Sequence, residues 1–368
     1  MTWTRLRLTA ATAGFALVAA GMFACSDQGD VTAPAGLARG GTQEPDLRAA
    51  LAAKAHYTSQ LLAQDGVVGT AVGLGRDGSP VIKVYLVRPG AATVSARLDG
   101  VAVETEVTGE ISAIDPTASP SRGKPGPGGG TDPTARFSRP VPIGVSSGNL
   151  NDLVYYRTFC TTGTLGARLK GANGNYYALS NNHVYAVENM AQLGDPIIQP
   201  GQADNGCRST TADQIGTLAG FVTLNFSRNA TNVADAAAAL VTTATVGNAT
   251  PSNGYGTPSS TIKTATLNMG VQKYGRTTVL THGTVTGVDA TIKVRYSKGH
   301  TATFVHQMVI GSGFSDSGDS GSLIVTDDSN KNPVGLLFAG SSSTTIGNPI
   351  DAVLTQLGGV LGTTLSIQ

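Results

Sequence analysis

From residue 137 onward the chain is a succession of short β-branched and apolar runs, each ended by Gly, Asn, Ser or Pro. The runs lie at 163–169, 176–180, 197–199, 215–224, 234–241, 283–288, 292–296, 304–310, 322–325 and 334–338. Short strands at this spacing favour an antiparallel sandwich or barrel over alternating strand–helix units, and leave those two open. Residues 348–361 carry the one apolar face at helical spacing in this half.

Composition narrows the possible partners. Charged residues make up 13% of the chain, roughly half the usual share of ~25%. The net charge of +1 provides no basic field, so we expect no nucleic-acid partner. None of the five histidines has convincing metal-ligand spacing to Cys or Asp, so we expect no metal and no cofactor.

The N-terminus has the features of an export signal. Two arginines precede an apolar run at residues 9–24 that is too short to span a bilayer comfortably. We therefore expect residues 1–24 to be a signal peptide and residues 25–44 a flexible tether. Cys25 follows a small residue in a context that resembles a bacterial lipobox, which leaves lipidation and plain secretion both open. Either outcome exports the chain to an oxidising compartment, as a periplasmic, outer-membrane-tethered or secreted protein.

A Pro/Gly-rich segment divides the exported chain. Residues 116–136 cannot bury apolar area, so we interpret them as a linker. Ahead of the linker, residues 45–64 have a broad apolar helical face, and strand-like runs follow at 67–74, 81–87 and 101–114. Residues 45–115 are therefore predicted to form a small α+β domain. Its place after the export signal suggests a pro-segment or a folding aid.

The first segment with catalytic character is Gly318-Asp319-Ser320-Gly321-Ser322. Glycines on both sides of Ser320 let the backbone turn sharply and approach a substrate carbonyl closely. The amide N–H groups around it can point at a developing oxyanion. A Ser/Gly/Asp surface turn is the alternative for this segment alone.

Two further segments supply a histidine and a carboxylate. His183 ends a Leu-Ser-Asn-Asn-His run that follows a strand-like stretch, where its ring can reach a serine from elsewhere. Asp235 heads a run of small apolar residues, and a buried carboxylate there needs donors such as an imidazole Nδ1–H. An ordinary core or surface histidine and a strand-capping aspartate are the alternatives. Other candidate carboxylates lie in turn-like contexts or out of order: Asp195, Asp213 and Asp289.

The order His183, Asp235, Ser320 resembles that of chymotrypsin-like serine proteases, and differs from the subtilisin and α/β-hydrolase orders. The Leu-Ser-Asn-Asn-His and Gly-Asp-Ser-Gly segments are most similar to a bacterial and plant trypsin-like group. The resemblance covers about residues 140–361. It implies that residues 137–368 form a trypsin-like serine protease domain. The implied fold is mainly β, a chymotrypsin-like double six-stranded antiparallel β-barrel with a C-terminal helix, preceded by the small α+β domain.

The resemblance also implies residue roles. Ser320 is the expected nucleophile, His183 the general base and Asp235 the residue that orients it. The N–H groups of Gly318 and Ser320 would form the oxyanion hole, with Asp319 turned inward. The expected substrate-pocket residues are Phe314, Ser315, Phe338, Ala339 and Gly340. Phe314, at the pocket floor, is not a carboxylate, so we expect poor cleavage after Lys or Arg and a preference for small or apolar residues.

We therefore expect an exported serine endopeptidase that hydrolyses protein or peptide substrates through an acyl-enzyme on Ser320, without a cofactor. Two alternatives stay open. One is a secreted β-rich binding or adhesion module with a vestigial triad, and the other is a serine esterase on the same fold. The sequence does not indicate the oligomeric state.

The two remaining cysteines flank His183 in sequence. If Cys25 is lipidated or removed, Cys160 and Cys207 are left as a pair in an oxidising compartment, where free thiols are open to reaction. We predict a disulfide between them that stabilises the region around His183. Two buried, reduced cysteines are the alternative.

Overall fold

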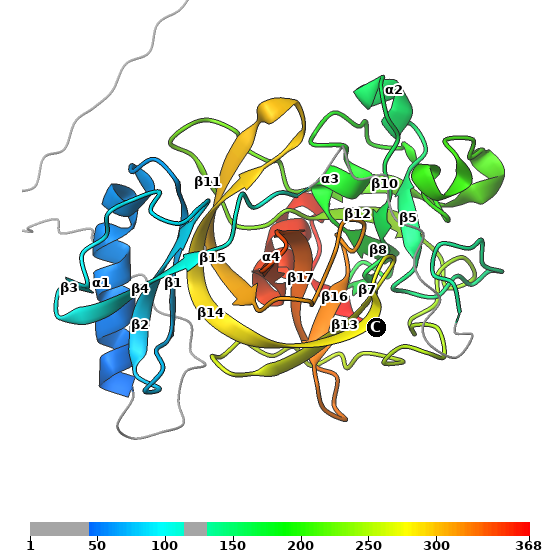
Figure 1. Cartoon of the computed structure of the whole chain (residues 1–368). Helices are drawn as coiled ribbons and strands as arrows, with labels where there is room; N and C mark the ends of the chain where they lie inside the picture. Colours follow the sequence, from blue (N-terminus) through cyan, green and yellow to red (C-terminus); the bar gives the residue numbers. More distant parts are fainter. Residues whose placement is uncertain (1–43, 114–130) are drawn as a thin grey trace, which may run out of the picture. The chain divides into compact units, whose positions relative to one another are not determined.

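The computed structural model describes residues 44–113 and 131–368 (Figure 1). The predicted signal peptide, Cys25, the tether up to residue 43, and residues 114–130, which include most of the predicted linker, lie outside the described residues. Within these described ranges, no helix is both long and apolar enough to cross a membrane.

Six antiparallel strands of the C-terminal half close on themselves as a barrel. They are β13 (Gly270–Gly275), β14 (Val279–Arg295), β15 (Thr301–Ile310), β16 (Leu323–Thr326), β17 (Pro333–Gly340) and β18 (Thr345–Pro349). The pairing runs β13–β14–β15–β18–β17–β16 and returns to β13. The long β14 was expected as two strands. Register irregularities between Val285 and Ile292 bend it without breaking it.

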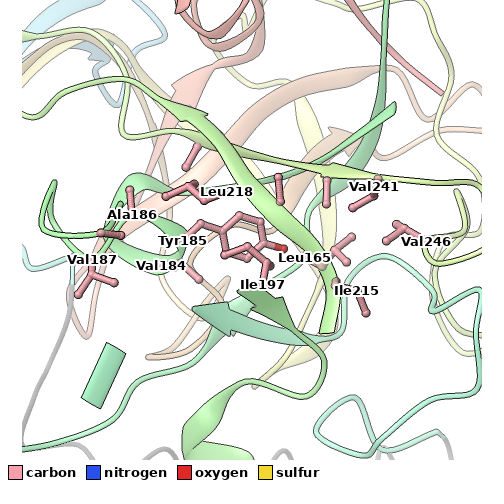
Figure 2. Packing of buried hydrophobic residues seen from close by; sticks show 14 of the residues in the cluster. Leu165, Val184, Tyr185, Ala186, Val187, Ile197, Ile215, Leu218, Val241 and Val246 are labelled. Carbon is pink, nitrogen blue, oxygen red and sulfur yellow. The ribbon is translucent and has the colours of Figure 1, made fainter. Parts of the chain in front are cut away.

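The preceding segment forms a second sheet of eight short strands. They are β5 (Ser146–Asn149), β6 (Gly163–Thr164), β7 (Ala167–Gly171), β8 (Tyr176–Ser180), β9 (Pro196–Ile198), β10 (Gln214–Phe221), β12 (Ala237–Val241) and β19 (Leu365–Ile367). Its core contains Leu165, Val184, Tyr185, Ile197 and Leu218 (Figure 2). Successive alanines of β12 alternate between this core and a second one, as the two-residue period of a strand requires. Their small side chains let β12 be buried on both faces.

The predicted C-terminal helix is confirmed as α4 (Ile350–Leu361), which buries Ile350, Val353 and Leu357. The expectation that it would be the only helix of this half is wrong. Two short helices also form, α2 (Asp152–Tyr156) and α3 (Asn182–Tyr185). Four or five residues span little more than one turn, which is too short to show a helical period in the sequence. Three 3₁₀ turns, η1 (Gln202–Asn205), η2 (Thr211–Asp213) and η3 (Ser297–Gly299), complete this half.

The segment before the linker has the expected mixture of helix and strands. It contains α1 (Glu44–Leu62), β1 (Val67–Leu74), β2 (Pro80–Leu86), β3 (Arg97–Leu98) and β4 (Val101–Val107). Strand β1 pairs with β2 and also with β14, so this sheet continues directly into the C-terminal barrel (Figure 1). The strand expected over 101–114 ends at Val107.

The expected fold class is thereby confirmed: the chain is mainly β, with two sheets in the chymotrypsin-like arrangement, one of them closed as a barrel, and a C-terminal helix. Six strands form the C-terminal barrel, while the other unit is divided into eight shorter strands. A two-residue strand, β11 (Thr231–Asn232), adds in parallel to β15.

Candidate active site

His183 and Asp235 are held together by two paired strands. His183 lies in α3, just after β8, and Asp235 lies two residues before β12. Because Ser180 pairs with Ala237 in the β8–β12 ladder, the two side chains meet at one end of it. Nδ1 of His183 lies 2.7 Å from Oδ2 of Asp235, and the His183 backbone N–H donates to Oδ1 at 3.2 Å. An ionised carboxylate only accepts hydrogen bonds, so this contact places the proton of the neutral ring on Nδ1.

The Asp235 carboxylate is fully buried and has a further donor. The hydroxyl of Tyr296 donates to Oδ2 at 2.7 Å. The Asp235 backbone is fixed as well, because its N–H donates to Oδ1 of Asn348 at 3.0 Å and its carbonyl accepts from Nδ2 of Asn181 at 2.7 Å. Tyr296 gave no signal in the sequence, because an aromatic residue in a strand is ordinary core material.

The loop that carries Ser320 requires its glycines. Gly318 and Gly321 have φ values of +96° and +95°, which residues other than glycine rarely adopt. A Cβ on Gly321 would also lie 2.3 Å from both Oγ of Ser180 and the carbonyl oxygen of Thr164. The residue after Ser320 therefore packs directly against the end of β8, three residues before His183.

Two carbonyl groups of this loop are turned away from the amides of Gly318 and Ser320. Oγ1 of Thr277 donates to the carbonyl of Ser317 at 2.6 Å. Oγ of Ser322 likewise donates to the carbonyl of Asp319 at 2.6 Å. In a planar trans peptide the N–H points opposite to the carbonyl. The N–H groups of Gly318 and Ser320 therefore point away from Thr277 and Ser322.

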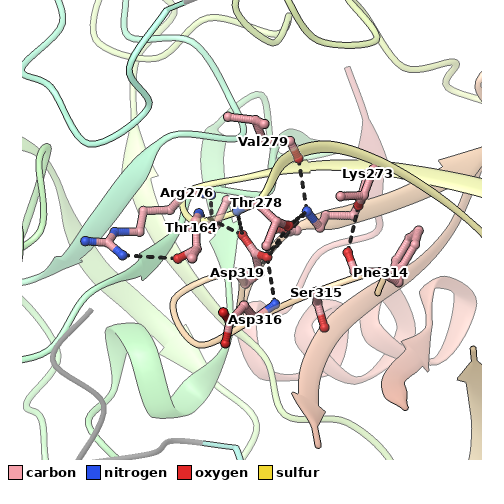
Figure 3. A network of polar contacts seen from close by, with 12 residues as sticks. Thr164, Lys273, Arg276, Thr278, Val279, Phe314, Ser315, Asp316 and Asp319 are labelled. Atoms are coloured by element: carbon pink, nitrogen blue, oxygen red, sulfur yellow. Dashed lines mark hydrogen bonds and ion pairs between the residues drawn. The ribbon is translucent and has the colours of Figure 1, made fainter. Parts of the chain in front are cut away.

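Asp319 turns inward, as the resemblance implied (Figure 3). Its carboxylate accepts from the N–H groups of Thr277 at 2.8 Å and Thr278 at 3.1 Å, and from the Thr278 hydroxyl at 2.6 Å. It accepts from the Asp316 N–H at 3.0 Å and lies 3.4 Å from Nζ of Lys273. Burial lowers the pKa of Lys273, while the charge of Asp319 opposes that shift. No role for Lys273 was predicted from the sequence.

The structure does not join Ser320 to His183 by a hydrogen bond. Oγ of Ser320 instead donates to the carbonyl of Ala113 at 3.3 Å. Nε2 of His183 is buried and has no hydrogen-bond partner among the described residues. Gly163 lies between the two segments, because an added Cβ there would lie 2.5 Å from the Val184 side chain and 2.9 Å from the Ser320 carbonyl oxygen.

Residues 111–113 cross the site as an extended segment. Ser112 and Gly340 exchange two backbone hydrogen bonds, each of 3.0 Å. On the other side, the Arg295 N–H donates to the Ile111 carbonyl at 2.8 Å, and the Ala113 N–H donates to the Arg295 carbonyl at 3.0 Å. The segment thus bridges the ends of β17 and β14 beside Ser320. The sequence pattern had assigned these residues to the end of a strand in the N-terminal unit.

The expected pocket residues lie at the end of β17 or in the segment shortly before Ser320. Phe314 is fully buried, with its ring 6.0 Å from Nζ of Lys273. Oγ of Ser315 is 2.6 Å from Oγ1 of Thr345. Phe338, Ala339 and Gly340 end β17, whose Leu337 carbonyl accepts from the N–H of Gly321 at 2.8 Å. The end of β17 is therefore attached to the loop that carries Ser320.

The predicted Cys160–Cys207 disulfide is confirmed, with a Cα–Cα distance of 5.9 Å. It closes a loop that contains His183. Across residues 44–113 and 131–368, no group of three or more His, Cys, Asp or Glu side chains could hold a metal ion.

Several proteases are among the solved structures similar to this chain. Thermobifida fusca Protease A is 18% identical over 62% of this chain and 100% of its own, with a TM-score of 0.41. Nocardiopsis protease is 16% identical over the same shares, with a TM-score of 0.40. Cellulomonas bogoriensis chymotrypsin is 18% identical over 56% of this chain and 90% of its own, with a TM-score of 0.36. No protein-family model and no curated protein matches the sequence.

Proposed function

We propose that the chain is a serine endopeptidase with His183, Asp235 and Ser320 as its catalytic triad. The observation that carries this proposal is the buried His183–Asp235 pair, with Nδ1 bonded to the carboxylate and Nε2 left without a partner among the described residues. The large majority of buried side-chain polar atoms in proteins have a hydrogen-bond partner, so an unpartnered ring nitrogen is unusual for a histidine with only a structural role. Here the second nitrogen is free to accept a proton, beside a loop that carries a serine hydroxyl.

In the proposed reaction Ser320 Oγ attacks the carbonyl carbon of a peptide bond while Nε2 of His183 takes the hydroxyl proton. The N–H groups of Gly318 and Ser320 stabilise the oxyanion. His183 then gives the proton to the leaving amine as the C–N bond breaks, which leaves an acyl-enzyme on Ser320. Water, deprotonated by His183, attacks the ester, and the Ser320 oxygen takes back the proton as it leaves. Asp235 holds the imidazole in the required tautomer and stabilises its protonated form.

The N-terminal unit is proposed to control access to this site. Residues 111–113 pair with Gly340 as an extended substrate strand would, and the Ala113 carbonyl accepts the hydrogen bond of the Ser320 hydroxyl. While this segment stays in place, a peptide substrate competes with it for the same backbone groups. This supports a pro-segment role in which the unit lies in front of the linker and blocks the site until the segment is displaced.

We propose a preference for small or apolar residues in the substrate. The pocket-floor candidate Phe314 offers no carboxylate to a Lys or Arg side chain, and its ring is buried in the barrel core. The chain's own segment beside Ser320, Ile111-Ser112-Ala113, is likewise small or apolar.

Export through residues 1–24, followed either by lipidation of Cys25 or by plain secretion, remains a proposal from the sequence.

Two variants at one position test the proposal. Ser112→Pro removes the N–H that donates to Gly340, whereas Ser112→Ala keeps both backbone bonds and serves as the matched control. Losing the Ser112–Gly340 hydrogen bond and adding the proline ring should weaken the contact of residues 111–113 with β17. The rate of fluorophosphonate labelling of Ser320 should therefore rise by roughly tenfold. Peptide hydrolysis should rise in parallel, and Ser112→Ala should behave as the unmodified chain.

The catalytic assignment is tested in the Ser112→Pro background. Ser320→Ala and His183→Ala should each abolish nearly all peptide hydrolysis, and the double variant should be little worse than either, because the triad acts as a unit. Hydrolysis retained in Ser320→Ala would refute the assignment. A folded Ser112→Pro chain that is never labelled would favour the binding module, and turnover of esters without peptides would favour the esterase.

A further inference from the structure

The Asp235 carboxylate accepts a hydrogen bond from a residue of the six-stranded C-terminal barrel. Tyr296 follows directly after β14, and its hydroxyl reaches Oδ2 of Asp235, the same oxygen that His183 Nδ1 contacts. Each of these two contacts is 2.7 Å, which is short enough for a strong, charge-assisted hydrogen bond. The carboxylate is fully buried, so no solvent can replace a donor that is lost.

The phenol is held in place from several sides. Its ring lies edge-on to His183 with centroids 6.1 Å apart, and packs against Phe226 at 5.3 Å. The Tyr296 backbone N–H donates to the His300 carbonyl at 2.8 Å. The next residue, Ser297, donates through its N–H and its hydroxyl to the buried carboxylate of Glu188 at 2.9 and 2.7 Å.

The charged groups around this phenol keep it a donor. Asp235 and Glu188 are both negative, and together with burial they raise the pKa of the Tyr296 hydroxyl well above its ordinary value. The hydroxyl therefore keeps its proton and remains a donor to Asp235. Burial dominates this shift, and the hydrogen bond to Asp235 adds to it.

We propose that Tyr296 is a positioning residue of the triad, whose hydroxyl fixes the Asp235 carboxylate against the His183 imidazole. This inference rests on the proposed function for its effect on catalysis, although the positioning itself does not require turnover. The arrangement makes the geometry of the pair, which stands on the β8–β12 ladder of the eight-stranded sheet, depend on the tip of the β14–β15 hairpin of the six-stranded barrel. A packed tyrosine with no such role would contribute only apolar contact.

The test compares Tyr296→Phe, which removes only the hydroxyl, with Phe226→Leu, which alters the packing of the same ring. The first measurement is the NMR resonance of the His183 Nδ1 proton, which does not require an active enzyme. Loss of the phenol leaves the imidazole as the only side-chain donor to Oδ2 within residues 44–113 and 131–368. The resonance should therefore move downfield in Tyr296→Phe and stay in place in Phe226→Leu. An unchanged resonance in a folded Tyr296→Phe chain would overturn the proposal.

The second measurement is kinetic, in the Ser112→Pro background. Losing one hydrogen bond to a buried charge should lower kcat by about tenfold to a hundredfold while KM stays the same. In an Asp235→Asn background, Tyr296→Phe should have little further effect, because the two residues act through one contact. Equal losses of kcat in both backgrounds would refute positioning through Asp235. A shifted resonance in a chain that hydrolyses nothing would refute the proposed function and leave the positioning intact.

Discussion

Asp152 is a buried carboxyl group whose ionisation should make the chain less stable as pH rises. It lies at the first turn of α2 and is fully buried. Oδ2 accepts from the N–H and the hydroxyl of Thr161 at 2.6 and 2.9 Å, beside Cys160. Oδ1 is buried with no hydrogen-bond partner among the described residues. Burial raises the pKa of Asp152 to about 7, against the opposing effect of the Thr161 hydrogen bonds.

The sign of the effect follows from proton binding. Between the unfolded pKa near 3.9 and the folded value of about 7, the native carboxyl keeps a proton that the unfolded chain releases. Its contribution to stability is therefore fully present below about pH 4 and is lost as pH rises through about 7. At about 1.4 kcal/mol per pKa unit, the contribution lost is at most about 4 kcal/mol.

The perturbation is Asp152→Asn, which keeps an acceptor for Thr161 and cannot titrate. The free energy of urea unfolding would be measured between about pH 4 and pH 8, in a Ser320→Ala background that prevents self-digestion. The variant should gain stability relative to the parent by up to about 4 kcal/mol across that range. Exposed Asp77, whose pKa Ser79 hydrogen bonds lower, is a control of opposite sign. Parallel curves for parent and Asp152→Asn would refute the reasoning.

Two further predictions concern the framework of the site. Replacing Cys160 and Cys207 with serine should lower the free energy of unfolding by about 4 kcal/mol, which is the chain-entropy value for a loop of this length. It should also lower kcat/KM. Calorimetry that shows equal stability with and without the disulfide would contradict this prediction. Gly321→Ala should destabilise the chain by about 3 kcal/mol or more, because its Cβ would meet Ser180 and Thr164 at 2.3 Å. The control Gly78→Ala has a similar φ of +81° in open space and should cost much less in the same unfolding assay.

The candidate triad could be predicted because each of its segments carries a local signal. The glycines beside Ser320 mark a sharp turn, and the structure gives both of them positive φ. The strand-like runs before His183 and after Asp235 become neighbours β8 and β12, which is why the two side chains meet. A disulfide across this region follows from cysteine count and compartment alone. Each inference uses residues close in sequence or a general chemical rule.

Tyr296 and Ala113 could not be predicted in the same way. Tyr296 is 61 residues from Asp235, and Ala113 is 207 residues from Ser320. Neither contact requires a special residue type at a special spacing, since a backbone carbonyl exists at every position and tyrosine is common in strands. Only the closure of the C-terminal barrel and its pairing with β1 bring these groups to the site.

The burial of β1 shows how the two parts are joined. β1 is buried along nearly its whole length, which is the pattern of a central strand and not of a strand with one solvated face. Gly69 and Gly73 let β1 pack closely against β14, because a Cβ at either position would lie within 3 Å of Ile292 or Thr286 of that strand. Lys54 of α1 adds a buried contact of 3.0 Å to the Thr291 hydroxyl on that strand. The N-terminal unit therefore covers a strand edge that would otherwise leave β14 amides unpaired, and the same strand leads to Arg295 and Tyr296 at the site.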